Sequence, residues 1–140
     1  MAKLGRYSAQ RKKVLDLGTT ATTISVAQCG TEFLVNQNGT ANITHTLPAV
    51  ADAGEGWWCA FTLKTAVNNV DADVTISSTA ANIFGIEVSD AAGEINSSAS
   101  TSILMEGNAA KVGTRVELWC DGLNYYAITF AHGDNDITRA

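Results

Sequence analysis

The feature that most constrains this chain is an alternation of apolar and polar residues with a period of two, which recurs from residue 19 onwards. In the segment 57–64, Trp57, Cys59, Phe61 and Leu63 fall on one side of an extended chain. Such alternation places the apolar side chains of a strand on a core and the others on the opposite face. No segment has the 3.6-residue period of a long helix, and the chain contains a single proline. The pattern therefore predicts an all-β protein.

Turn-forming residues separate the alternating segments from one another. The segments that we expect to be strands are 19–27, 31–36, 40–47, 57–64, 74–78, 83–88, 102–106, 114–120 and 123–130. About eight or nine strands at this spacing are typical of a β-sandwich, a jelly roll or a barrel, and these alternatives stay open here. The 140 residues, 46% of them hydrophobic, are enough for one domain with one core.

The last two of these strands are expected to form a hairpin, because Asp121-Gly122 is a common turn between antiparallel strands. The residues expected to face the core are Val116, Leu118 and Cys120 on the first strand and Tyr126, Ile128 and Phe130 on the second.

Three aromatic residues, Trp58, Trp119 and Tyr125, are predicted to lie on the outer faces of their strands. Exposed aromatic side chains on a sheet indicate a partner, which could be a second subunit or a sugar. The outward neighbours expected from the alternation are small and weakly polar: Ala60, Thr62, Ala127 and Thr129. Because a sugar site needs clustered Asp, Asn, Gln or Arg, these neighbours favour a subunit interface.

Charge is distributed unevenly along the sequence. Residues 1–13 contain five of the nine basic residues and no acid, whereas the remainder carries four basic and fourteen acidic residues, a net charge of −10. We predict a basic extended N-terminal arm at 1–18, a β-rich body at 19–132 and a C-terminal tail at 133–140. The arm is interpreted as a docking segment for an acidic protein surface. Direct nucleic-acid binding is disfavoured, since the body has no second basic patch and the pI is about 4.8.

The sequence contains no recognisable catalytic or metal-binding pattern. His45 alternates with apolar residues and is expected in the core, while His132, with Asp134 and Asp136, lies in a polar stretch expected to be solvated. GxSxG and the glycine-rich phosphate-binding motifs are missing from the sequence. We therefore predict no enzymatic activity, no metal and no cofactor. No apolar run approaches the ~18 residues of a transmembrane helix, so no membrane partner is expected.

The three cysteines, Cys29, Cys59 and Cys120, are an odd number at wide spacing, and no CxxC pair occurs. Buried free thiols are the expected state of Cys59 and Cys120, which lie in apolar runs. A disulfide between these two stays open, because it depends on whether their strands face each other.

Three stretches of the sequence together resemble a known type of protein. They are MAKLGRYSAQRKKV at the N-terminus, GTEFLVNQNGTANITHTLPAVADAGEGWWCAFTLKTA, and GTRVELWCDGLNYYAI near the C-terminus. In these stretches the chain resembles the small head decoration (cement) proteins of tailed bacteriophages, including those of cyanobacterial phages. Residues 68–112 take no part in the resemblance.

The resemblance implies a β-rich body that forms a homotrimer on the outer surface of the capsid, where it binds the major capsid protein and stabilises the head against internal DNA pressure. An arm of ~13 residues reaches up to ~45 Å when extended and could tie neighbouring capsid proteins together. The arm residues expected to bind the capsid are Lys3, Leu4, Arg6, Tyr7, Arg11, Lys12 and Lys13. Trp58, Trp119 and Tyr125 are the candidates for the subunit interface. The alternative function is a receptor- or carbohydrate-binding module of a virion fibre.

Overall fold

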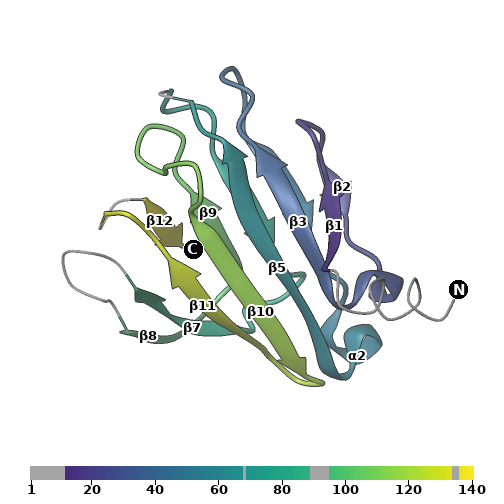
Figure 1. The fold of residues 1–140 in the computed structure, drawn as a ribbon. Helices are drawn as coiled ribbons and strands as arrows, with labels where there is room; N and C mark the ends of the chain where they lie inside the picture. The colour runs from purple at the N-terminus through teal and green to yellow at the C-terminus, as the bar shows by residue number, and fades with distance from the viewer. Residues whose placement is uncertain (1–11, 68, 89–94, 134–135) are drawn as a thin grey trace, which may run out of the picture.

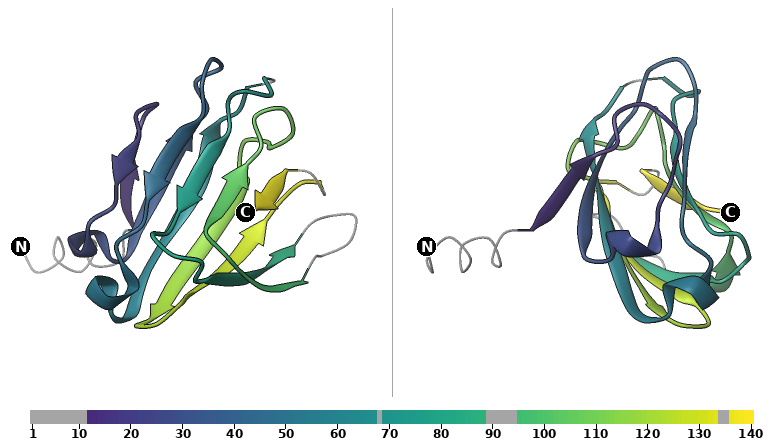
Figure 2. Two further views of the ribbon diagram at one scale, coloured as in Figure 1. Left: turned by 180° about the vertical axis from the view of Figure 1, so that it is seen from behind. Right: turned by 90° about the vertical axis from the view of Figure 1, so that its right-hand side faces the viewer.

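The computed structural model describes residues 12–67, 69–88, 95–133 and 136–140. In these ranges the chain is almost entirely β-structure, arranged as two mixed sheets that lie face to face (Figures 1 and 2). Sheet A contains, in spatial order, β1 (Lys13–Asp16), β3 (Thr31–Asn36), β5 (Glu55–Thr65), β10 (Arg115–Asp121), β11 (Tyr125–Phe130), β7 (Ile83–Val88) and β8 (Ile95–Ser100). Sheet B contains β12 (Ile137–Arg139), β9 (Ser102–Met105), β6 (Val74–Ser77), β4 (Ile43–Thr46) and β2 (Thr22–Thr23). Two short helical turns, the 3-10 turn η1 (Val26–Gln28) and the α-turn α2 (Val50–Ala53), lie between strands.

The order of the strands follows from a chain that crosses repeatedly between the two sheets. From β1 to β7 each strand lies in the sheet opposite to the one before it. Parallel neighbours in a sheet need a crossover connection. Here the intervening strand in the other sheet provides that connection. The pairs β1–β3, β3–β5, β2–β4 and β4–β6 are accordingly parallel. The β10–β11 hairpin is antiparallel, as predicted from Asp121-Gly122.

The core fills the space between the sheets and is built from the predicted stripes. Trp57, Cys59, Phe61 and Leu63 on β5 are at most 3% exposed. Val116, Leu118 and Cys120 on β10 are also buried, and the rings of Phe33 and Phe61 stack with centroids 5.1 Å apart. The alternation thus identified the inner face of both central strands correctly. Both sheets end on edge strands, so the molecule is an open sandwich and no closed barrel.

The predicted boundaries of the arm and of the tail are wrong. Residues 13–16, placed in the arm, form β1, which pairs in parallel with β3 from Lys13–Thr31 to Asp16–Leu34. Residues 137–139, placed in the tail, form β12, which pairs with β9 and buries Ile137. Both strands are short edge strands with few buried side chains, so the alternation that predicts the other strands is missing from them.

Two internal predictions also need correction. The segment 19–27 contains only the two-residue strand β2 and the beginning of η1, because its threonines lie mostly exposed at the edge of sheet B. Between 88 and 102, where no strand was predicted, the structure contains β8, which pairs with β7 through backbone hydrogen bonds that need no apolar pattern. The register of β7 and β8 shifts between Ile83 and Gly85.

The inner and outer faces of β11 are the reverse of the prediction. Tyr125, Ala127 and Thr129 face the core and are at most 1% exposed, whereas Phe130 is 41% exposed. The reason is the register of the hairpin, in which Cys120 pairs with Tyr125 and Trp119 with Tyr126. A residue opposite the inward Cys120 must itself face inward, because paired residues point to the same side of a sheet.

Candidate binding surface on the seven-stranded sheet

Exposed apolar side chains gather on the outer face of sheet A, the face directed away from sheet B. The large apolar residues with the highest exposure number eleven in the described chain, and six of them are on this face. They are Val14, Trp58, Ile86, Val88, Trp119 and Phe130. Scattered apolar residues are normal on a protein surface, but a contiguous group marks a binding surface.

An aromatic row crosses this face at right angles to the strands. It consists of Trp58 on β5, Trp119 on β10, Tyr126 on β11 and Phe84 on β7, each paired in register with the next. The centroids of the Trp119 and Tyr126 rings are 5.9 Å apart, and those of Tyr126 and Phe84 are 6.3 Å apart, with nearly parallel planes in both pairs. Trp58 and Trp119 are 47% and 43% exposed, so the row is open to solvent at the β5–β10 end.

Gly30, which precedes β3, leaves room for the first ring of the row. A Cβ atom on Gly30 would lie 3.5 Å from Cζ2 of Trp58, so the indole lies over the glycine backbone. The amide N–H of Gly30 also donates to the carbonyl oxygen of Trp58 at 2.7 Å. The backbone at Gly30, directly before β3, therefore supports the indole of Trp58 on its inner side.

A second group on the same face is purely aliphatic and aromatic. Ile128 pairs with Ile86, and Phe130 pairs with Val88, on the adjacent parallel strands β11 and β7. Ile86, Val88 and Phe130 are 40%, 46% and 41% exposed. We call Ile86, Val88, Ile128 and Phe130 the apolar patch. None of the four side chains is charged.

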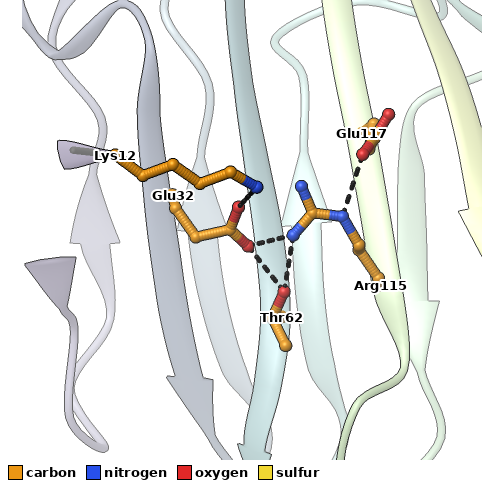
Figure 3. Close-up of polar contacts among 5 residues, drawn as sticks. All are labelled: Lys12, Glu32, Thr62, Arg115 and Glu117. Atoms are coloured by element: carbon orange, nitrogen blue, oxygen red, sulfur yellow. Dashed lines mark hydrogen bonds and ion pairs between the residues drawn. The ribbon is translucent and has the colours of Figure 1, made fainter. Parts of the chain in front are cut away.

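A cluster of charged residues lies between β1 and β10, next to the aromatic row (Figure 3). Arg115 donates from Nη1 to Glu32, and from Nε to Glu117 at 2.9 Å. The hydroxyl of Thr62 donates to Glu32 at 2.6 Å and accepts from Arg115 at 2.9 Å. Lys12 Nζ lies 3.7 Å from Glu32 on the other side. Register explains the cluster, because Glu32 and Thr62 face outward on neighbouring strands and Arg115 pairs with Thr62.

Hydrogen bonds within the cluster keep Glu32 and Arg115 charged. Burial alone would raise the pKa of Glu32, but hydrogen bonds from Arg115 and Thr62 outweigh it and hold that pKa below its usual value. Burial would likewise lower the pKa of Arg115, yet its bonds to Glu32 and Glu117 raise it. Glu32 and Arg115 therefore form an ion pair at neutral pH, with side chains only 10% and 22% exposed.

The aromatic row and the charged cluster border one depression of about 200 Å³. Its lining residues include Lys12, Trp58, Ala60, Arg115, Glu117 and Trp119. Ala60 is the small outward residue at its floor, 1% exposed.

The structure separates the residues that the sequence grouped as interface candidates. Trp58 and Trp119 are exposed, as predicted. Tyr125 is not: it is fully buried, and its hydroxyl donates to the carbonyl oxygen of Pro48 at 2.7 Å. Tyr125 is therefore a core residue that cannot contribute to an outer surface, and Tyr126 takes its place in the aromatic row.

Most of the predicted arm lies outside the described residues. This holds for Lys3, Leu4, Arg6, Tyr7 and Arg11. Lys12 and Lys13 are described: Lys13 begins β1 of sheet A, and Lys12, directly before it, lies 3.7 Å from Glu32.

The buried polar and sulfur-containing residues match the sequence prediction in part. His45 lies in the core, as expected, but both of its ring nitrogens lack a hydrogen-bond partner among the described residues. Cys59 and Cys120 are buried free thiols, so the disulfide left open between them is not formed. Burial raises the pKa of both thiols.

The polar segment that contains His132 is held in a turn by Asp136. The backbone N–H groups of His132 and Gly133 donate to Asp136 at 2.9 and 3.0 Å, so the Asp136 carboxylate closes the turn before β12. Asp134 lies outside the described residues. Within the described ranges, no three His, Cys, Asp or Glu side chains gather as metal ligands, and no helix has the length and apolar character of a membrane span.

Sequence reasoning missed most of the polar residues at this surface. Glu32, Arg115 and Glu117 were not singled out, although each has the outward parity of its strand. The apolar patch was missed because Ile128 and Phe130 were assigned to the core. Comparisons of the chain with known protein families, with curated proteins and with solved structures give no match.

Proposed function

We propose that this protein is a non-enzymatic decoration (cement) protein of a tailed-phage head, which binds the major capsid protein on the outer surface of the shell as a homotrimer and stabilises the head against internal DNA pressure. The observation that carries the proposal is the apolar patch. The resemblance of the sequence to phage decoration proteins supplies the biological setting.

The apolar patch has the composition of the centre of a subunit contact. Cores of protein interfaces are depleted in charge and rich in aromatic and large aliphatic residues. Ile86, Val88 and Phe130 each leave about two fifths of their surface in water. Their backbone belongs to paired strands inside a sheet, so no ordering of a loop opposes association.

The place of the patch on sheet A leaves the basic N-terminal residues free for another partner. The patch lies on β11 and β7, whereas the chain enters the sheet at β1, four and five strand positions away. At a spacing of ~4.8 Å per strand, this is about 19–24 Å across the sheet. Subunits that associate through the patch would therefore carry residues 1–11 at their periphery, next to neighbouring capsid proteins.

The charge distribution fits this division of roles. Lys3, Arg6 and Arg11 precede a body that is strongly acidic. Three such segments in one trimer would bind a repeating capsid surface with avidity, since each further segment binds at high effective concentration.

Removal of residues 1–11 tests the proposal. Wild-type protein should co-sediment with expanded, undecorated phage heads, while the truncated protein should keep its trimeric mass but stay in the supernatant. A full-length control with Lys3, Arg6 and Arg11 replaced by Gln keeps the chain length and should bind more weakly. Truncated protein that decorates heads as well as the intact chain would overturn the role of the arm.

A further inference from the structure

We propose that the depression between the aromatic row and the charged cluster binds an uncharged glycan, with a sugar ring packed on Trp58 and Trp119 and its hydroxyl groups bonded to Arg115 and Glu117. This site replaces the subunit contact that the sequence predicted for the two tryptophans. It shares no residue with the apolar patch but borders it, since Arg115 pairs with Phe130 and Glu117 with Ile128.

The aromatic row supplies the apolar half of the site. Trp58 and Trp119 are directly paired on β5 and β10, and both expose more than two fifths of their surface. The row continues through Tyr126 and Phe84 over about 14 Å, three strand spacings, which is longer than one sugar ring. A saccharide can therefore continue along the row beyond the depression, which by itself is smaller than the ~300–1,000 Å³ of pockets for drug-sized ligands.

The charged cluster supplies hydrogen-bonding groups that are already held in place. Glu32 and Thr62 occupy Nη1 of Arg115, and Glu117 occupies its Nε. The remaining Nη2 of Arg115 and Oε2 of Glu117 make no hydrogen bond to the described part of the chain, and the Glu117 side chain is 45% exposed. A donor and an acceptor are thus available on two side chains that line one depression, and a pair of hydroxyl groups on a sugar ring can bond both.

The charges of the depression favour a neutral ligand. The two cations that line it, Lys12 and Arg115, are both ion-paired with Glu32, which lies outside the lining, and Arg115 is also paired with Glu117, which lines it. An anionic polymer would gain nothing from this balance and would be repelled by the acidic body, whose charge is −10 beyond residue 13. This argues against single-stranded nucleic acid, which also stacks on aromatic side chains but needs a basic groove.

The sequence argument against a sugar site rested on four small neighbours, and two of them face inward. Ala127 and Thr129 are buried on the core side of β11, and Thr129 donates to the carbonyl oxygen of Ile86 at 3.1 Å. Ala60 and Thr62 do face outward, but the tryptophans share the depression also with Lys12, Arg115 and Glu117, and charged side chains are among the residue types that such a site needs.

A weak binding site of this kind binds more strongly when many copies of it are held on one particle. If the protein coats a phage head, as the proposed function requires, many copies would present the depression on one particle, and their avidity could hold the particle on a glycan-coated surface. The binding test below uses purified protein without heads, so it succeeds or fails independently of the proposed function.

The test is a titration of the purified full-length chain with cellohexaose, maltohexaose, mannohexaose and chitohexaose, followed by tryptophan fluorescence and calorimetry. We expect saturable binding of at least one of them, with Trp119→Ala weakening it about tenfold or more and Glu117→Gln weakening it to a smaller extent. Val88→Ser, in the apolar patch on β7 and two strand positions from β10, is the matched control on the same face and should bind the sugar like the wild type.

Each of three binding results would overturn the proposal. The first is no saturable binding of any of the four oligosaccharides. The second is a Trp119→Ala protein that has an unchanged melting curve and binds as tightly as the wild type, and the third is tighter binding of an oligothymidylate or dextran sulfate than of every neutral sugar. Native mass measurement completes the test. If Trp119→Ala splits the oligomer, the tryptophans form a subunit contact and the depression is not a glycan site.

Discussion

His45 is an unusual residue of the core. Its side chain is fully buried and stacks on Phe61 with centroids 6.5 Å apart, yet neither ring nitrogen has a hydrogen-bond partner among the described residues. A buried polar group without a partner costs roughly 1–3 kcal/mol. Burial also lowers the pKa of His45 below its ordinary value of 6.5, because the charged imidazolium is poorly solvated there.

This burial predicts a dependence of stability on pH. The unfolded chain binds a proton at His45 below pH 6.5, whereas the folded chain stays neutral until lower pH. The free energy of unfolding should therefore fall as the pH decreases through 6.5, by at most about 1.4 kcal/mol per pH unit. In urea titrations between pH 5 and 7.5, His45→Leu should remove most of this slope and should be at least as stable as the wild type at pH 5. An equal slope in both proteins would show that another group is responsible.

The Glu32–Arg115 ion pair predicts a second effect at single residues. Arg115→Met leaves the Glu32 carboxylate, 10% exposed, without its main partner and should lower the free energy of unfolding by about 1–3 kcal/mol. Glu32→Gln combined with Arg115→Met should recover part of this loss, since no unpaired charge remains. Chemical denaturation of both single variants and the double variant measures the coupling, and simple additivity of the two losses would contradict an interaction between them.

At the scale of elements, the close approach of β7 to β11 depends on Gly85. A Cβ atom at this position would lie 2.1 Å from the carbonyl oxygen of Ala127 and 2.9 Å from Nη2 of Arg139. The backbone of a paired strand cannot yield to such a contact without loss of hydrogen bonds.

Gly85→Ala should therefore destabilise the protein by about 1–3 kcal/mol, or more if the β7–β11 pairing is lost. Gly133→Ala is a suitable control, because its Cβ would meet nothing closer than 3.7 Å and its backbone is not in the left-handed region. Thermal unfolding by circular dichroism compares them, and equal melting temperatures for the two variants would contradict the close approach.

Sequence predictability also differs from element to element. β3 and β7 were predicted with their observed bounds, and the inward stripes of β5 and β10 were correct, because one buried face imposes a strict period of two. β1 and β12 were missed because edge pairing through the backbone leaves no apolar pattern. The face of β11 could have been derived: a two-residue turn at Asp121-Gly122 pairs even-numbered residues of β10 with odd-numbered residues of β11, so Tyr125 must face inward like Leu118 and Cys120. The observed register, in which Tyr125 pairs with Cys120, is shifted by two residues and keeps this parity. The apolar character of Ile128 and Phe130 instead favoured the core for these two residues. They are apolar because they belong to the exposed apolar patch.

For the molecule as a whole, we assign different functions to two regions on the outer face of sheet A, the apolar patch and the depression beside the aromatic row. The open sandwich could be predicted from the sequence as a fold class, but the charged cluster could not, since it joins residues 32, 62 and 115 through the strand order of the sheet. The same order separates the apolar patch from the point where residues 1–11 enter, and this separation underlies the proposal that subunits meet through one region and reach the capsid through another.

Native mass spectrometry of the wild type beside an Ile86→Ser/Phe130→Ser variant tests the central claim most directly. Leu123→Ser, which changes a residue 75% exposed in the β10–β11 turn, serves as the control. We predict a mass of about 44 kDa, three copies of the 14.7 kDa chain, for the wild type and the control, and a monomer for the patch variant. A wild-type mass of 14.7 kDa at micromolar concentration, or a patch variant that remains trimeric, would contradict it.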